Sequence, residues 1–226
     1  MRSGLTLLIA AALALGLVGS SSGQEGGAVF VVTFIEAVPS AAAQTRDLLA
    51  AYAKSSRREA GNAELEALQR VGRQNHFALV EEWASAEALE QHAHSVDTGR
   101  FTADLRPLLY SPPDRRVHSG LVTGPRREAG VEAVYVLTHI DVFPQSVPQV
   151  IESLQALATA SRAEAGNRRF DALVTERKNH MTVIEVWQTA AAQDAHLGAA
   201  HNRSFRENLA AVQGALYDER LYRPVR

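Results

Sequence analysis

The chain has 226 residues, with 23 lysines and arginines against 25 aspartates and glutamates, a net charge of −2 and a hydrophobic share of 46%. This composition provides a packed core and excludes a disordered chain. The near-neutral charge argues against a nucleic-acid partner, which would require a basic surface. Cysteine is absent, so disulfides, thiolate metal sites and a cysteine nucleophile are excluded.

Residues 1–23 have the layout of a secretory signal peptide. Arg2 gives a positive start, residues 5–18 are apolar or small, and residues 19–23 are small and polar. The apolar run is shorter than the ~20 residues that span a bilayer. We therefore expect cleavage near residue 23 and a mature protein that is exported, periplasmic or secreted, with no membrane partner; an uncleaved anchor is the alternative.

The remaining chain consists of two similar segments. Glu-Ala-Gly-Asn at residues 59–62 recurs at 164–167, and Glu-x-Trp at 81–83 recurs at 185–187. His92 and Phe101 recur as His196 and Phe205, in the same order. Conserved order at many positions is typical of an internal duplication. The sequence predicts a first repeat at 28–122, a linker at 123–130 and a second repeat at 131–226.

Each repeat is predicted to run strand, helix, strand, strand, helix, strand. Pro39 and Pro144 end the first strands, and Ser85 and Thr189 can cap later alanine-rich helices. Gly61 and Gly166 stand where a helix end needs a left-handed residue. Strands are expected at 29–38, 64–70, 77–83 and 115–122 in the first repeat, and at 134–143, 169–175, 181–187 and 219–225 in the second.

Both faces of the predicted sheets are apolar. Phe77, Leu79 and Trp83 point one way, and Ala78 and Val80 point the other. Two helices cover only one face, so the other requires a second sheet. The sequence thus predicts an α+β protein in which two ferredoxin-like βαββαβ repeats pair as an intrachain barrel, a pseudo-dimer. Higher assembly stays open.

The repeated Glu-Ala-Gly-Asn, Glu-x-Trp, His and Phe pattern resembles the antibiotic biosynthesis monooxygenase family, over both repeats. The resemblance implies a dimeric α+β barrel and cofactor-free oxidation of phenolic or quinol-like substrates by O2. The family also includes members of no known activity. Its members often carry a tyrosine just after the Gly-Asn turn. Here Ala63 and Arg168 follow instead, which argues against a tyrosine-dependent mechanism.

Two histidines and two glutamates are candidate catalytic bases. His92 and His196 could each take a phenolic proton, because histidine titrates near neutrality. If the face that carries Glu81 and Glu185 lines the barrel, burial would raise their pKa and suit them as bases too. The alternatives are a histidine that anchors helix to sheet and a glutamate paired at a strand end.

Substrate-binding candidates are aromatic or imidazole side chains: Trp83, Trp187, Phe101, Phe205 and His139. The tryptophans could stack on a flat substrate, and core packing is the alternative for both tryptophans and phenylalanines. The repeats differ at Phe34 and His139 and at Asp97 and His201. These differences favour one working pocket, in the second repeat.

No cofactor or metal is expected. His92 and His94 lie two apart on a helix and cannot face one ion, and Gly198 replaces the second of them in the other repeat. Three functions remain open: an oxygenase for a small quinol or polyphenol, an exported binding module for an aromatic or lipid-like ligand without turnover, and a scaffold with a filled barrel.

Overall fold

The computed structural model describes residues 27–226, so the predicted signal peptide lies outside the described residues. The predicted element order is confirmed in both repeats. The first repeat comprises β1 (Val29–Glu36), α1 (Ala42–Ser56), β2 (Asn62–Arg70), β3 (His76–Trp83), α2 (Ala86–Ala93), α3 (Val96–Leu105) and β4 (Asp114–Val122). The second comprises β5 (Val134–Asp141), α4 (Val147–Ala163), β6 (Asn167–Val174), β7 (His180–Trp187), α5 (Ala190–Leu197), α6 (Ala200–Ala210) and β8 (Asp218–Pro224).

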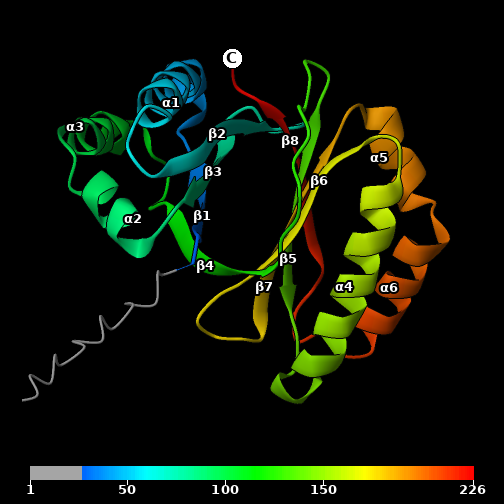
Figure 1. Ribbon diagram of the computed structural model, residues 1–226. Coiled ribbons are helices and arrows are strands. Elements are labelled where there is room, and N and C mark those ends of the chain that lie inside the picture. The colour runs from blue at the N-terminus through cyan, green and yellow to red at the C-terminus, as the bar shows by residue number, and fades with distance from the viewer. Residues whose placement is uncertain (1–26) are drawn as a thin grey trace, which may run out of the picture.

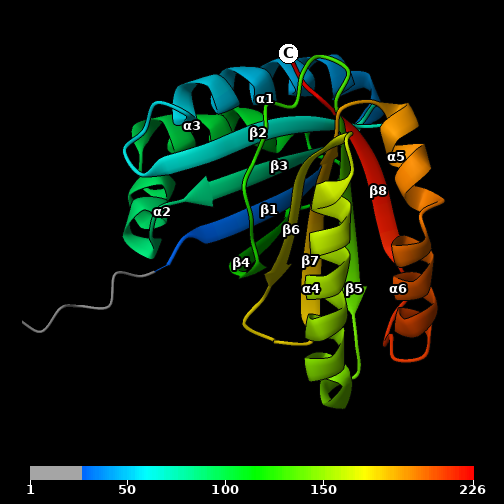
Figure 2. The ribbon, with the colours of Figure 1, turned by 45° about the vertical axis from the view of Figure 1, so that its right-hand side comes forward.

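The eight strands close into one barrel in the order β1-β3-β2-β8-β5-β7-β6-β4. The two repeats join along two antiparallel seams, β2 with β8 and β4 with β6. Helices α1–α3 lie on one side of the barrel and α4–α6 on the opposite side (Figure 1). The turned view shows the strands of the two repeats crossing (Figure 2). The predicted intrachain pseudo-dimer is therefore the observed fold.

Strand alternation divides the core into an inner layer and two outer layers. Phe30 and Val80 from the first repeat meet Tyr135 and Tyr222 from the second inside the barrel. The opposite strand faces pack against the helices of their own repeat. This arrangement confirms that each sheet covers the face that the helices of the other repeat leave open. Within residues 27–226, no helix has the length and apolar character to cross a bilayer.

The alanine-rich helical segment of each repeat is divided in two. Ser85 and Thr189 cap its first half as predicted, since each side-chain oxygen accepts a backbone N–H at 3.2 Å. In the first repeat a second cap follows: Ser95 accepts from the Thr98 N–H at 3.1 Å and starts α3 in a new direction. The break places α2 over the end of the sheet and α3 beside α1 (Figure 1).

The two glycines after the first long helices differ in backbone conformation. Gly61 has φ +79°, the left-handed conformation that was predicted. Gly166 is not among the positive-φ residues of the described chain, so the prediction for it is wrong. The role that both glycines share is close approach of a helix, because a Cβ on Gly61 would overlap the Cβ of Ala88 on α2 and a Cβ on Gly166 would overlap the Cβ of Ala192 on α5.

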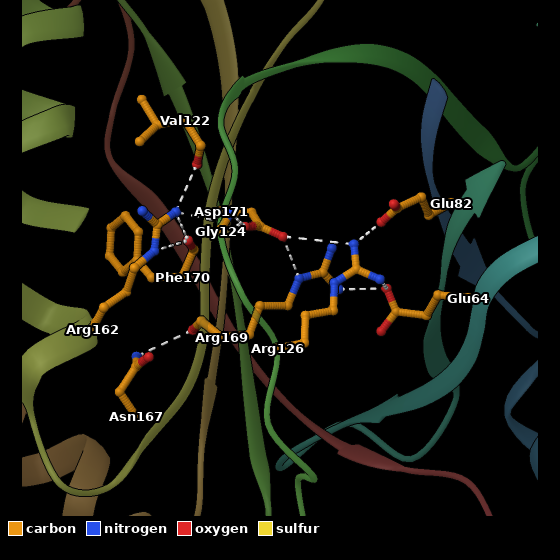
Figure 3. Close-up of polar contacts among 10 residues, drawn as sticks. All are labelled: Glu64, Glu82, Val122, Gly124, Arg126, Arg162, Asn167, Arg169, Phe170 and Asp171. Carbon is orange, nitrogen blue, oxygen red and sulfur yellow. Dashed lines mark hydrogen bonds and ion pairs between the residues drawn. The ribbon is translucent and has the colours of Figure 1, made fainter. Parts of the chain in front are cut away.

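A buried ionic network joins the repeats at one end of the barrel (Figure 3). Arg169 is 2% exposed and donates to Asp171 and Glu64 at 2.6 Å each. Arg126, from the predicted linker, pairs with Glu64 at 3.1 Å and with Glu82 in the first repeat, and lies 3.8 Å from Asp171 in the second. The linker is therefore tied to both repeats.

Glu64 and Arg169 occupy equivalent positions in the two repeats, 105 residues apart. They face each other across the pseudo-twofold axis of the barrel, and their charges are opposite. The Glu64–Arg169 pair is thus a contact between equivalent positions of the two repeats.

Candidate functional site

The first repeat holds a cavity of about 310 Å³ between its helices and the outer face of its sheet. This volume is at the low end of the range for small-molecule sites. Its wall is formed by Thr33, Ile35, Tyr52, Leu79, Glu81, Thr98, Phe101, Thr102, Leu105, Arg106, Leu109, Pro113 and Arg115. The wall is mainly apolar, with a phenol and a buried carboxyl group inside and two exposed arginines at its edge.

A larger groove of about 730 Å³ lies beside the linker. Its charged groups are Glu82 and Arg126, which pair with each other. Since these two groups form an ion pair, the charged side chains among the described residues that line the groove are already engaged with each other. The smaller cavity is therefore the better candidate for a site.

Three side chains from separate segments form a hydrogen-bonded chain that ends at the cavity. Glu59, in the loop after α1, contacts His92 Nδ1 at 2.9 Å. His92 Nε2, on α2, contacts the Tyr52 hydroxyl of α1 at 2.7 Å. His92 is 4% exposed, and the Glu59 side chain is 26% exposed. The chain thus connects a phenol on the cavity wall with a glutamate side chain that is partly exposed.

The tautomer of His92 follows from its two partners. The Glu59 carboxylate only accepts, so Nδ1 carries the proton and donates to it. Nε2 then holds a lone pair and accepts from the Tyr52 O–H. Thr98 Oγ1 lies 3.2 Å from the same hydroxyl, and the Phe101 ring stacks on the Tyr52 ring with centroids 3.7 Å apart. The Tyr52 hydroxyl is therefore fixed in position.

Glu81 supplies the second polar group of the cavity. It is 5% exposed, and its Oε2 accepts from the Trp83 indole N–H at 3.0 Å and lies 3.7 Å from His92 Nε2. Burial raises the pKa of Glu81, while the Trp83 hydrogen bond and His92 act in the opposite direction. Burial also raises the pKa of Tyr52, and Glu81 adds to the effect. Burial therefore shifts both groups toward their protonated forms compared with the same groups in water.

The second repeat keeps the histidine and the carboxylates. His196 Nδ1 contacts Glu164 at 2.7 Å, and Glu185 Oε2 accepts from the Trp187 indole N–H at 2.9 Å. Burial raises the pKa of Glu185 to about 8 and lowers that of His196.

The tyrosine of the first repeat is not repeated. Leu157 stands in the place of Tyr52. Tyr217 replaces Pro113 and packs against the helix-side core of the second repeat, with the Arg206 guanidinium 3.8 Å from its ring centroid. The Tyr217 side chain thus occupies the layer between helices and sheet in the second repeat, where the first repeat has its cavity.

Several predicted site residues lie in other places than the sequence suggested. The face that carries Glu81 and Glu185 packs against helices and does not line the barrel. Glu81 and Phe101 lie on the cavity wall, whereas His92 and Trp83 lie behind it. His139 is on the opposite strand face from Glu185, next to a barrel-end groove.

The described cavity is in the first repeat, although the sequence favoured the second. Trp187, His196 and Phe205 are buried in the helix layer of the second repeat. Sequence reasoning missed Tyr52, because it looked for a tyrosine only after the Gly-Asn turn, whereas Tyr52 comes from α1. Its replacement by Leu157 in the other repeat is the signal that could have identified it.

The fold and the cavity define a duplicated α+β barrel with a helix-covered small-molecule cavity. A profile of the family described as "Antibiotic biosynthesis monooxygenase" matches residues 28–103 and 133–208. The chain belongs to the antibiotic biosynthesis monooxygenase family, as a tandem duplication, and the predicted resemblance is confirmed.

Known relatives agree with this assignment. The Bacillus subtilis protein named "Putative monooxygenase YcnE" is 34% identical over 59 residues, which cover 26% of this chain and 62% of that protein, less than two thirds of its length. A Fusobacterium nucleatum structure described as a "Putative monooxygenase" has a TM-score of 0.82 at 15% identity, covering 89% of this chain and 94% of that chain. An "anthrone oxidase-like protein" has a TM-score of 0.68 at 15% identity, covering 89% and 93%. At these identities the two structures show the fold alone.

Proposed function

We propose that the first-repeat cavity oxidises a small phenolic or quinol-type aromatic with O2, without a cofactor. The observation that carries the proposal is the Glu59–His92–Tyr52 chain, which ends at an otherwise mainly apolar cavity next to Glu81. Membership of a family named for monooxygenases, and the name of the anthrone oxidase-like relative, support the reaction class. The volume of the cavity suits two or three fused rings.

The first chemical step is removal of the phenolic proton of the substrate. The Tyr52 oxygen can accept a hydrogen bond from a substrate hydroxyl while its own proton is donated to His92 Nε2. Because the pKa of Tyr52 is raised, a free tyrosinate is disfavoured. The substrate proton therefore moves to Tyr52 as the Tyr52 proton moves to His92. Glu59 stabilises the resulting imidazolium, in the way that a carboxylate orients a catalytic histidine.

The second step is oxidation of the electron-rich anion. A phenolate with a C–H ortho or para to its oxygen gives one electron to O2, and the radical pair combines to form a C–O bond. The proton held by His92 then returns to the peroxide oxygen and gives a hydroperoxide. Loss of water from the hydroperoxide then leaves a quinone carbonyl. One oxygen atom of O2 enters the product and the other leaves as water, so no external reductant is required. The protein contributes a base, orientation and exclusion of water.

Oxygen uptake tests this proposal. The full chain is assayed with 1-naphthol, anthrone and substituted hydroquinones, and with ¹⁸O2 to detect one labelled atom per product. We expect Tyr52→Phe and His92→Gln to lower the rate by about 10²–10⁴-fold, the usual contribution of general-base catalysis. His196→Gln is the matched control in the second repeat and should retain the rate.

Two results would contradict the proposal. If phenols bind in the cavity without oxygen uptake, the protein is a binding module for aromatic ligands. If His196→Gln abolishes turnover while His92→Gln does not, the reaction takes place in the second repeat.

A further inference from the structure

Three side chains of metal-ligand type meet in the second repeat. Glu164 follows α4, His196 lies near the end of α5, and His201 lies in the first turn of α6. Glu164 Oε1 is 2.7 Å from His196 Nδ1 and 2.9 Å from His201 Nε2. The three ligand atoms all lie within 4.8 Å of one another. Among residues 27–226, these three side chains form the one cluster of at least three metal-ligand groups that the fold brings together.

We propose that Glu164, His196 and His201 bind a divalent cation of the zinc type. Two imidazole nitrogens and one carboxylate oxygen are a ligand set that zinc accepts, with a fourth position left for water. Zinc–ligand distances of about 2.0–2.2 Å place such ligand atoms roughly 3.3 Å apart. The two spacings to Glu164 Oε1, 2.7 and 2.9 Å, are a few tenths of an ångström shorter than that value, and the two histidine nitrogens lie within 4.8 Å of each other. The cation would replace the two imidazole protons that now point at Glu164 Oε1.

The surroundings of the site combine access with support. The side chains of His201 and Glu164 are 30% and 23% exposed, so an ion can enter, while His196 is 2% exposed and fixed. His196 stacks on the Trp187 ring, with centroids 4.5 Å apart. The site therefore has one rigid ligand and two ligands that can adjust.

An outer carboxylate faces the second nitrogen of His196. Glu185 Oε2 lies 3.5 Å from His196 Nε2 and is held by the Trp187 N–H at 2.9 Å. With a cation on Nδ1, the proton of His196 must be on Nε2 and point at Glu185. A metal-bound histidine typically donates its other N–H to a carboxylate in this manner. This contact is independent of the three ligand atoms and fits the same occupant.

The first repeat shows what distinguishes this cluster. The residue equivalent to His201 is Asp97, which is exposed, and His92 Nε2 is engaged by the Tyr52 hydroxyl. In the second repeat, Leu157 leaves His196 without a phenol partner. The two repeats thus differ in what surrounds the shared histidine: a tyrosine hydroxyl in the first repeat and a second histidine in the second.

Zinc binding to the full chain, prepared without a histidine tag and stripped with EDTA, tests the proposal. Calorimetry with ZnCl2 should give one ion per chain, and Co²⁺ should give the visible absorption of a four-coordinate site. His201→Asp, which copies the first repeat, and Glu164→Gln should each weaken zinc binding by more than about 100-fold. Glu185→Gln should weaken it by about 10-fold, as expected for an outer partner. His94→Ala, an exposed histidine elsewhere, is the control and should leave binding unchanged.

Unfolding temperatures in EDTA show whether each variant folds like the parent chain, and zinc should raise that temperature only where the three ligands are intact. The proposal is overturned if the parent chain binds no zinc, or if folded His201→Asp binds it as tightly as the parent. It is also overturned if the ion is lost in His94→Ala.

Discussion

Replacing Arg169 by methionine should reveal how strongly the ionic network holds the two repeats together. Arg169→Met keeps an unbranched side chain and removes the guanidinium, which is 2% exposed. Asp171, 1% exposed, and Glu64 then lose their 2.6 Å contacts. Both carboxylates lose their shortest cationic contact, and only longer contacts to other arginines remain.

The expected cost follows from what Asp171 retains. Removing one partner of a buried ion pair costs about 3–5 kcal/mol, because the other charge stays buried. Asp171 keeps the Gly124 N–H at 3.0 Å, and Arg126 and Arg162 each at 3.8 Å. We therefore expect the lower end of the range, about 3 kcal/mol. For a chain of this size that corresponds to a fall of roughly 6–12 °C in Tm.

Urea unfolding and calorimetry measure the loss, with Arg177→Met, an exposed arginine of the same repeat, as the control. The control should change stability by less than about 0.5 kcal/mol. Asp171→Asn in the Arg169→Met background should cost about 1–3 kcal/mol less than the sum of the single changes. A loss below about 1 kcal/mol for Arg169→Met, or strict additivity, would refute the account of a coupled buried network.

Two further predictions concern the second repeat. Because burial raises the pKa of Glu185 from its ordinary 4.5 to about 8, the folded chain keeps a proton that the unfolded chain releases. The free energy of unfolding should therefore fall as pH rises from about 4.5 to 8, by at most about 1.4 kcal/mol per pH unit. Glu185→Gln should flatten that part of the stability curve, and parallel curves for the two proteins would contradict the assignment. Gly166→Ala should cost about 1–3 kcal/mol because its Cβ meets Ala192; adding Ala192→Gly should recover part of the loss in urea unfolding, and no recovery would show that the strain lies elsewhere.

Most of the fold could be predicted because it depends on patterns that are local in the sequence. The eight strands follow runs of apolar and β-branched residues. Because of the duplication, each element could be predicted from two independent segments of sequence. The barrel could be predicted because each sheet has two apolar faces and its helices cover only one. Ala78 and Val80 point away from the helices that cover Leu79, so a second sheet has to cover them. The break at Ser95 was missed, since a serine inside a helical pattern does not itself show whether it caps a new helix.

The candidate site was predicted less well because it depends on which segments meet. Tyr52 fits an apolar stripe as well as it fits a cavity wall, and only the position of α2 shows that its hydroxyl reaches His92. Glu164 and His201 are 37 residues apart and join only through the packing of α6 beside the end of α4. The choice of repeat was decided by Pro113 and Tyr217, which lie outside the motifs that carry the resemblance.

The Glu64–Arg169 pair has a consequence for how this barrel can assemble. A symmetric dimer of first repeats would place Glu64 against a second Glu64, and a dimer of second repeats would place Arg169 against a second Arg169. Either arrangement sets like charges together in the partly buried position where the natural pair is 2.6 Å apart. Each repeat is therefore matched in charge to the other and not to a copy of itself, so this one pair disfavours both of the homodimers from which such a fold could otherwise be built.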